Sequence, residues 1–292
     1  MRILVCAKND LPANLACNRL CQGLDDADLT FWLSDITRPA EQSDGDLTTM
    51  RLFERDLPNR WLFPLIEKGP ARPNDAYLTF PELARRHNAA LSIVPSLRDD
   101  DAETTMRELA PDLVISIRFS HIFPESLIRI PRHGILNIHP GRLPEYAGLY
   151  APFRQMLDGR GEIGCTVHWI DRGIDTGPVV SRGTVPIDRA RSLIWHVCHA
   201  YTPGVDEVLH IVHGLKEGRQ PSSESQNTSR RTYHRLPRPT EFQDFRDRGF
   251  RLIDFDDYDG LLQIYRADTT DMVTGIDLHG RPKADGSSRM RA

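Results

Sequence analysis

Short apolar runs alternate along most of this chain with stretches whose apolar positions repeat at helical spacing. The apolar runs predict strands at residues 3–7, 28–33, 91–95, 112–117, 135–139, 163–170 and 179–187. The stretches between them predict helical segments at residues 13–23, 51–55, 61–67, 102–109, 119–127, 151–157 and 193–217. Because strands that alternate with helices favour parallel pairing through right-handed crossovers, we predict an α/β fold with a mostly parallel twisted sheet and helices on both faces.

Breaks in this pattern refine the predicted fold. Ser192 precedes the last helical stretch and is predicted to be its N-cap, while Pro203 and Gly204 should interrupt that stretch. The strand at residues 179–187 should lie near the edge of the sheet. The turn after the first strand carries no Gly-x-Gly-x-x-Gly pattern, so a nicotinamide-binding domain is disfavoured.

The composition changes after Gly218. Residues 220–229 are polar and linker-like, and residues 230–238 begin a stretch rich in arginine, aspartate and aromatic side chains. We therefore predict a catalytic domain at residues 1–218 and a short C-terminal extension at residues 219–292. The last residues of that extension, 280–292, are predicted to be disordered.

Overall composition limits the function classes. The 292 residues are 39% hydrophobic and 27% charged, with a net charge of −4, which is ordinary for a globular protein and gives no general attraction to nucleic acid or anionic lipid. The first apolar run is too short for a signal or membrane segment. Five scattered cysteines without a Cys-x-x-Cys pair predict reduced thiols and a cytoplasmic location.

An amide, an imidazole and a carboxylate stand where two predicted loops begin. Asn137 and His139 end an apolar run two positions apart, so both side chains should leave a strand by the same face and at its carboxyl end. Asp175 lies between Gly173 and Gly177 in a later loop. Such groups can stabilise an oxyanion and move protons in acyl transfer. Taken alone, the pair is more often a strand cap, and an aspartate beside glycine is often a turn residue.

Together with residues around them, these side chains resemble the 10-formyltetrahydrofolate-dependent formyltransferase superfamily, which includes glycinamide ribonucleotide, methionyl-tRNA and sugar N-formyltransferases. The pattern of that family runs in order from about Pro111 to Ile187 as Asn137 and His139, Leu143 and Pro144 with Gly148, Gly164 with Thr166 and His168, and Asp175 with Gly177. The resemblance implies a Rossmann-like fold and an enzyme that moves a formyl group from 10-formyltetrahydrofolate to a primary amine.

The resemblance also implies roles for individual residues. Asn137 and the imidazolium form of His139 would donate hydrogen bonds to the oxyanion, and Asp175 would favour the charged imidazole and accept a proton from the attacking amine. The residues expected to line the folate slot are Ser120, His121, Ile122, Phe123, His168, Asp171 and Gly173. Those expected near the acceptor are Arg142 and Tyr150, with Arg118 flanking the cleft. The family often has arginine at the position of His121.

The acceptor is the least constrained part of this prediction. Gly141 and Arg142 stand where many family members have serine, residues 148–155 differ from the loop of methionyl-tRNA enzymes, and the region after Gly218 is shorter than their C-terminal barrel. Transfer RNA is therefore disfavoured, and no nucleic acid or membrane partner is expected. A nucleotide-linked amino sugar is the first choice, followed by an amino acid or other small amine. Residues 230–238 would either bind its diphosphate or pack the extension on the core.

Other functions stay open at this point. Water in place of the amine would give a 10-formyltetrahydrofolate hydrolase, and loss of catalysis would leave a folate-binding module. His196 with His199, and His210 with His213, have helical spacing but lack a carboxylate or cysteine partner set, so we predict ordinary helix-surface histidines and no metal. A homodimer is an open alternative to a monomer.

Overall fold

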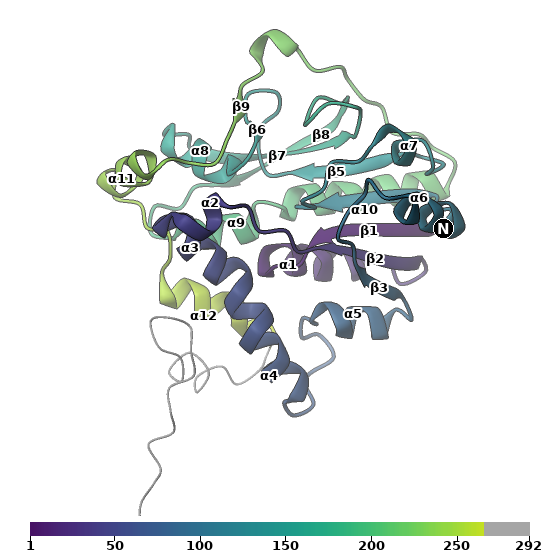
Figure 1. Cartoon of the computed structure of the whole chain (residues 1–292), viewed down its shortest axis with the longest axis horizontal. Helices are drawn as coiled ribbons and strands as arrows, with labels where there is room; N and C mark the ends of the chain where they lie inside the picture. Colours follow the sequence, from purple (N-terminus) through teal and green to yellow (C-terminus); the bar gives the residue numbers. More distant parts are fainter. Residues whose placement is uncertain (266–292) are drawn as a thin grey trace, which may run out of the picture.

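Seven strands form the central sheet of the computed structural model, which describes residues 1–265 (Figure 1). The disorder predicted for residues 280–292 concerns a segment outside the described residues. The strands lie in the order β3-β2-β1-β4-β5-β7-β8. Their bounds are β1 Arg2–Lys8, β2 Asp28–Ser34, β3 Ala90–Ile93, β4 Leu113–Ile117, β5 Ile135–His139, β7 Glu162–Trp169 and β8 Val179–Pro186.

The sheet is parallel from β3 to β5 and antiparallel beyond it. β1 pairs parallel with β2 and β4, and β4 pairs parallel with β5, whereas β7 pairs antiparallel with both β5 and β8. The predicted mostly parallel, Rossmann-like α/β sheet is therefore confirmed, and β8 lies at the edge as predicted. The carboxyl ends of β1, β4 and β5 meet at one edge of the sheet, which is where such folds place their sites.

Helices cover both faces of this sheet. In β1, Ile3 and Val5 point into the larger hydrophobic cluster with α1, α9 and α10, whereas Leu4 and Cys6 point into the smaller cluster with α6 and α7. The alternation follows from the two-residue period of a strand, and burial on both sides explains why the strand is apolar throughout. The bounds of these helices are α1 Leu11–Cys21, α6 Asp100–Leu109, α7 Glu125–Ile128, α8 Ala151–Leu157, α9 Leu193–His199 and α10 Thr202–Lys216.

The predicted interruption of the last helical stretch separates α9 from α10, with Pro203 in the first turn of α10. Pro203 fits there because a helix's first N–H groups have no partner within the helix. Ser192 is the N-cap residue of α9 as predicted, but its hydroxyl donates to Asp257 Oδ2 at 2.6 Å and makes no capping hydrogen bond to the helix. Ser192 thus ties α9 to the C-terminal extension.

Residues 40–86 contain the helices that connect β2 to β3. The elements are α2 Ala40–Ser43, α3 Gly45–Arg51, the π-helical turns η1 Leu52–Asp56 and η2 Pro58–Leu62, then α4 Phe63–Lys68 and α5 Phe80–Arg86. Pro58 has no N–H to donate. The π-helical turn η1 ends at Asp56, shortly before Pro58, and η2 begins at Pro58. Glu54, in η1, is 6% exposed and reaches the pocket described below.

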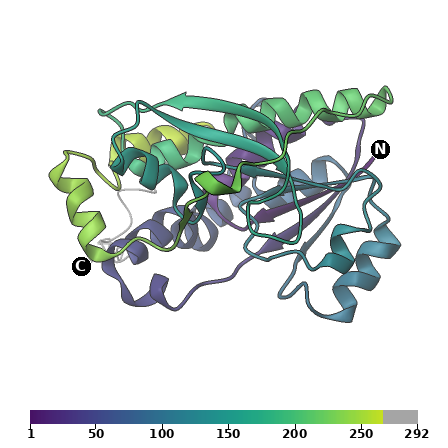
Figure 2. The ribbon, with the colours of Figure 1, turned by 90° about the horizontal axis from the view of Figure 1, so that it is seen from above.

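The C-terminal extension packs on the same core. Its elements are the 3₁₀ turn η3 Thr228–Arg230, β9 Tyr233–His234, α11 Pro239–Asp247 and α12 Phe255–Gln263. Phe242, Phe245 and Tyr265 are buried in the larger cluster. Figure 2 shows the segment between α10 and α11 as an extended green chain that crosses the β7–β8 side of the sheet. β9 pairs with the short strand β6 Ala147–Gly148. The domain division at Gly218 stays a prediction.

Among residues 1–265, no helix has both the length and the apolar character needed to cross a membrane. The five cysteines are free and buried.

Candidate active site

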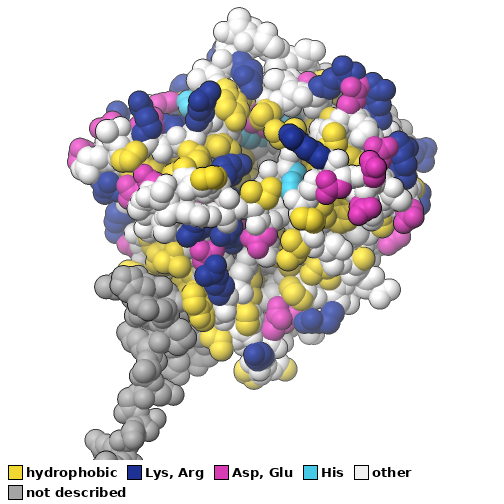
Figure 3. All heavy atoms as spheres, viewed as in Figure 1, with side chains coloured by type: hydrophobic (Ala, Val, Ile, Leu, Met, Phe, Trp, Pro, Cys, Tyr) yellow, Lys and Arg dark blue, Asp and Glu magenta, His cyan; other side chains and the backbone are white. Residues whose placement is uncertain are grey.

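A cavity of about 320 Å³ lies at the carboxyl ends of β1, β4 and β5. Its walls come from the chain after β4, from the end of β5, from the loop after β7 and from the start of α8. Figure 3 shows this face of the molecule, with a hollow near its centre between apolar and basic side chains. A cavity of this size at this place in an α/β sheet is the expected position of a small-molecule site.

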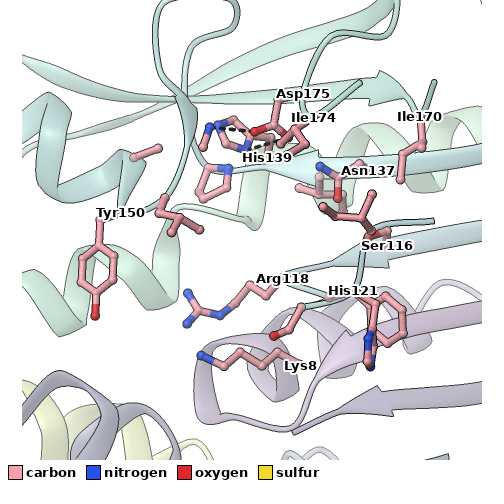
Figure 4. A pocket seen from close by; sticks show the side chains of 18 of the residues that line it. Lys8, Ser116, Arg118, His121, Asn137, His139, Tyr150, Ile170, Ile174 and Asp175 are labelled. Carbon is pink, nitrogen blue, oxygen red and sulfur yellow. Dashed lines mark hydrogen bonds and ion pairs between the residues drawn. The ribbon is translucent and has the colours of Figure 1, made fainter. Parts of the chain in front are cut away.

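Asn137, His139 and Asp175 converge in this cavity (Figure 4). His139 Nδ1 lies 3.7 Å from Asp175 Oδ1, and Asn137 Nδ2 donates to His168 Nε2 at 3.1 Å. His168 Nε2 lies 3.8 Å from the same Asp175 oxygen. The structure therefore brings together, around one carboxylate, the groups that the sequence pointed to.

A hydrogen bond on the side away from Asp175 fixes the imidazole of His139. Its Nε2 donates to the carbonyl oxygen of Tyr146 at 2.7 Å, and the side chain is 5% exposed. Since a carbonyl can only accept, Nε2 carries a hydrogen, and Nδ1 is the nitrogen that faces Asp175. Gly141 makes this packing feasible, because a Cβ there would lie 2.7 Å from His139 Nε2. The turn after β5 therefore needs glycine at position 141, because a larger residue would collide with the His139 ring.

The loop that carries Asp175 has an unusual backbone. Asp175 has a φ of +54°, a left-handed conformation that costs energy for a residue with a Cβ. Its Oδ2 accepts from the Gly148 N–H at 2.7 Å, which leaves Oδ1 facing both imidazoles. A Cβ on Gly177 would lie 1.8 Å from the Trp169 carbonyl oxygen. The Asp-x-Gly pattern therefore reflects a tight turn that aims one carboxylate oxygen into the cavity.

His168 acts on Asn137. Its Nδ1 donates to the Trp169 carbonyl at 2.9 Å, so its Nε2 is free to accept the Asn137 amide hydrogen. Burial lowers the pKa of His168, although the nearby Asp175 charge opposes this. The neutral ring fixes one amide hydrogen of Asn137 and leaves the other for a ligand. His168 also lines the cavity, as expected for a folate-lining residue.

Acid should weaken the fold through His168. The lowered pKa means that the unfolded chain binds this proton more readily, so the stabilisation is present above about pH 6.5 and is lost as the pH falls below it. One such proton changes the free energy of unfolding by up to about 1.4 kcal/mol per pH unit. We expect His168→Gln to flatten the pH dependence of urea unfolding between pH 7 and 5 relative to the parent, because glutamine binds no proton in this range. The flattening should be partial, because the other buried histidines remain. Equal slopes would contradict this assignment.

The predicted folate-slot residues lie on one side of the cavity. Ser120, His121, Ile122 and Phe123 line it, with Ile122 58% exposed and Phe123 buried. The His121 ring donates from Nε2 to the Val94 carbonyl at 2.8 Å. Across the slot, the loop residues Asp171 and Gly173 also line the cavity, and the Asp171 carboxylate accepts from the Gly173 N–H and the Thr176 hydroxyl.

The opposite wall carries several charges. Arg118, which the sequence predicts beside the cleft, has a φ of +58° and forms ion pairs with Asp10 at 2.9 Å and Glu54 at 2.7 Å. Further lining residues on this side are Lys8, Arg38, Glu41 and Tyr201. Hydrophobic periodicity does not predict these positions, because Lys8 ends a strand, Arg38 lies in a loop and Glu54 lies in a π-helical turn. Glu54 stands beside Arg55 and Asp56 in η1, so the sequence offers no signal that separates it from surface charges.

Two predicted acceptor residues lie in different places. Tyr150 lines the cavity, with a φ of +57°. Arg142 is exposed and is not among the cavity-lining residues, because its backbone packs over Gly164 and its side chain turns outward. The position after Gly141 therefore faces solvent in this chain.

The histidine pairs are not equivalent. His210 and His213 are exposed, as predicted for helix-surface residues. The prediction is wrong for His196, which is fully buried, donates from Nδ1 to the Ser192 carbonyl and accepts the Asp188 N–H at Nε2. Within residues 1–265, no group of three or more His, Cys, Asp and Glu side chains is placed to hold a metal ion.

Comparison with known proteins identifies the part of the chain that resembles a known family. Residues 76–193 match the family model described as formyl transferase. Residues 76–193 are therefore similar to a formyl transferase domain. The matched residues contain the site side chains Asn137, His139, His168 and Asp175, whereas Lys8, Glu54 and Tyr233 of the cavity lie outside them.

The curated relatives that match part of this chain include methionyl-tRNA formyltransferases. A methionyl-tRNA formyltransferase of Geobacter sulfurreducens is 33% identical over 147 residues, which are 49% of this chain and 46% of that protein. The chain thus matches just under half the length of such curated relatives.

Solved structures share the fold at low identity. Glycinamide ribonucleotide transformylase 1 from Symbiobacterium toebii superposes with a TM-score of 0.53 and 16% identity, covering 78% of this chain and 94% of that one. WlaRD, a sugar 3N-formyl transferase solved in the presence of dTDP and 5-N-formyl-THF, gives a TM-score of 0.51 at 16% identity, with 88% and 80% covered. At this identity the likeness shows the fold.

Proposed function

We propose that this protein is an N-formyltransferase that moves a formyl group from 10-formyltetrahydrofolate to the primary amine of a small molecule. The observation that carries the proposal is the convergence of Asn137, His139 and Asp175 at one cavity, all three within the residues that match the formyl transferase model. WlaRD, which shares the fold and was solved in the presence of a formyl-folate, supports the donor. The buried free cysteines support a cytoplasmic setting.

The cavity fits the proposed donor. A pterin needs apolar walls for its ring and main-chain groups for its edge, and residues 120–123 face residues 170–175 across a slot with both. Ile122 and Ile174 offer exposed apolar surface at its mouth, 58% and 41% exposed. In this position the formyl group would lie next to His139 and Asn137.

The geometry assigns atoms to the proposed reaction. The amine nitrogen attacks the formyl carbon, and the carbonyl oxygen becomes an oxyanion. The free amide hydrogen of Asn137 and, in the imidazolium form, the Nδ1–H of His139 are the groups placed to stabilise it. Asp175 Oδ1, whose partner oxygen is held by the Gly148 N–H, accepts the proton of the attacking amine. The oxyanion then re-forms the carbonyl as the bond from the formyl carbon to the folate nitrogen breaks, and that nitrogen takes the proton that Asp175 received from the amine.

For the acceptor, we propose a nucleotide-linked amino sugar. The charged wall of Lys8, Arg38 and Arg118 with Glu41 and Glu54 offers both donors and acceptors, as a sugar hydroxyl set requires. Arg38 keeps 35% exposure of its side chain and lies 3.8 Å from Glu41, so it can still meet a phosphate. The dTDP present with WlaRD agrees with this class.

The basic stretch after the linker contributes less to phosphate binding than the sequence allowed. Arg230 forms an ion pair with Glu145, and Arg231 donates to the Ile174 carbonyl at 2.9 Å, so both arginines pack the extension on the core. Tyr233 and Leu236 of the same stretch do line the cavity. We therefore place these two side chains beside the acceptor.

The test is tetrahydrofolate release from 10-formyltetrahydrofolate by the purified protein, measured with panels of nucleotide-linked amino sugars, amino acids and methionyl-tRNA. We expect release only with an amine, together with a formylated amine in mass spectrometry. Release that no amine changes would favour the hydrolase. Donor binding without release under every condition would leave a folate-binding module and overturn the proposed activity.

A further inference from the structure

A segment outside the matched residues 76–193 lies across the loop of Asp175. We call residues 224–234 the strap. Glu224 exchanges two main-chain hydrogen bonds with Val179 at 2.8 Å, and Tyr233 and His234 pair with Ala147 and Gly148. The sequence predicts a linker over part of this segment, and most of residues 222–230 are exposed. The contacts nevertheless fix it at both ends over the cavity.

Gln226 connects the strap to the loop of Asp175. Its Nε2 donates to the carbonyl oxygens of Asp175 at 3.1 Å and Gly177 at 2.8 Å. Both amide hydrogens are therefore used on the two residues that flank the turn. Gln226 is half-buried while its neighbours are exposed. This single side chain thus bridges a strained turn whose first residue has a φ of +54°.

Two further contacts of the strap act on the same carboxylate. Arg231 donates to the carbonyl of Ile174, the residue before Asp175, at 2.9 Å. β9 holds β6 in place, and the Gly148 N–H of β6 donates to Asp175 Oδ2 at 2.7 Å. The strap therefore supports both the backbone of Asp175 and the donor that orients its side chain.

From these contacts we propose that the strap positions Asp175 for proton transfer and that Gln226 is a positioning residue for it. This inference rests on the proposed N-formyltransferase activity. A left-handed aspartate persists only where its surroundings hold it, and Gln226 Nε2 is the side-chain donor that joins the carbonyl oxygens of Asp175 and Gly177. Without that amide the turn relaxes, and Asp175 Oδ1 moves away from His139.

The test uses Gln226→Leu, which keeps the approximate volume and removes the donor, and Gln226→Glu, which directs an anion at two carbonyl oxygens. We expect each to lower kcat by about 10- to 100-fold with little change in KM for 10-formyltetrahydrofolate, since a displacement of about 1 Å at a reacting group has effects of that order. Gln220→Leu is the matched control, because Gln220 lies in the same polar stretch and bonds only outward to His133 at 3.3 Å. It should behave as the parent.

A second readout separates positioning from general support of the fold. If Gln226 acts through Asp175, adding Gln226→Leu to Asp175→Asn should cause no further loss of kcat. Multiplied losses would overturn the inference, and so would full activity of Gln226→Leu in an active parent.

Amide hydrogen exchange tests the strap without relying on catalysis. Exchange at residues 171–178 should be faster in Gln226→Leu than in Gln220→Leu. Unchanged exchange would overturn the inference. Faster exchange in Gln226→Leu, together with a parent protein that transfers no formyl group, would overturn the proposed function alone.

Discussion

Asp175→Asn is expected to lower kcat for formyl transfer by about 100- to 10,000-fold, the range lost when a positioned general base is removed. Asparagine keeps the shape of the side chain, and its Oδ1 can still accept the Gly148 N–H that now holds Asp175 at 2.7 Å. What it loses is the carboxylate oxygen 3.7 Å from His139 Nδ1, which is the proposed proton acceptor. The measurement is amine-dependent tetrahydrofolate release.

The control for this prediction is Asp206→Asn, which removes the same charge outside the cavity. Asp206 has a side chain 50% exposed and accepts from Arg19, so its loss touches no group of the proposed reaction. Its kcat should stay near the parent's. Both variants should bind a non-reactive folate analogue as the parent does. Equal activity of Asp175→Asn and the parent would reject Asp175 as the base.

Asn137→Leu is expected to lower kcat by about 100- to 1,000-fold, since removal of one oxyanion donor has effects of that order. Leucine has a similar size, but it offers no hydrogen to the oxyanion and leaves the His168 Nε2 acceptor without the bond of 3.1 Å that Asn137 makes. The measurement is kcat at saturating donor and amine.

Ser116→Ala provides the comparison for Asn137. Ser116 lies directly beside Asn137 in the parallel pair of β4 and β5, and it lines the same cavity. Because no role in the proposed reaction depends on its hydroxyl, the change should leave kcat almost unaltered. A loss in Ser116→Ala as large as that in Asn137→Leu would show that the region responds to any change in packing.

The sheet and the catalytic side chains were accessible from the sequence. β5 Ile135–His139 and α8 Ala151–Leu157 have the predicted bounds, because apolar runs closed by Pro140-Gly141 and short helices after glycine loops are locally encoded. Asn137 and His139 share a face of β5 for the same reason, and so could be placed before any coordinates.

The other half of the cavity could not be predicted in this way. Glu54 comes from a π-helical turn, and Gln226 lies in a stretch with the composition of a linker. Their roles depend on contacts between residues far apart in the chain, which leave no periodic trace. The helical spacing of His196 and His199 likewise does not indicate that His196 is buried.

The residues that line the cavity come both from the matched span, residues 76–193, and from segments outside it. Residues 76–193 supply Asn137, His139 and Asp175, while the charged wall and the strap come from before and after that span. Under the proposed function, exchange of the segments before residue 76 and after residue 193 should change the amine that is accepted, while residues 76–193 keep the formyl chemistry.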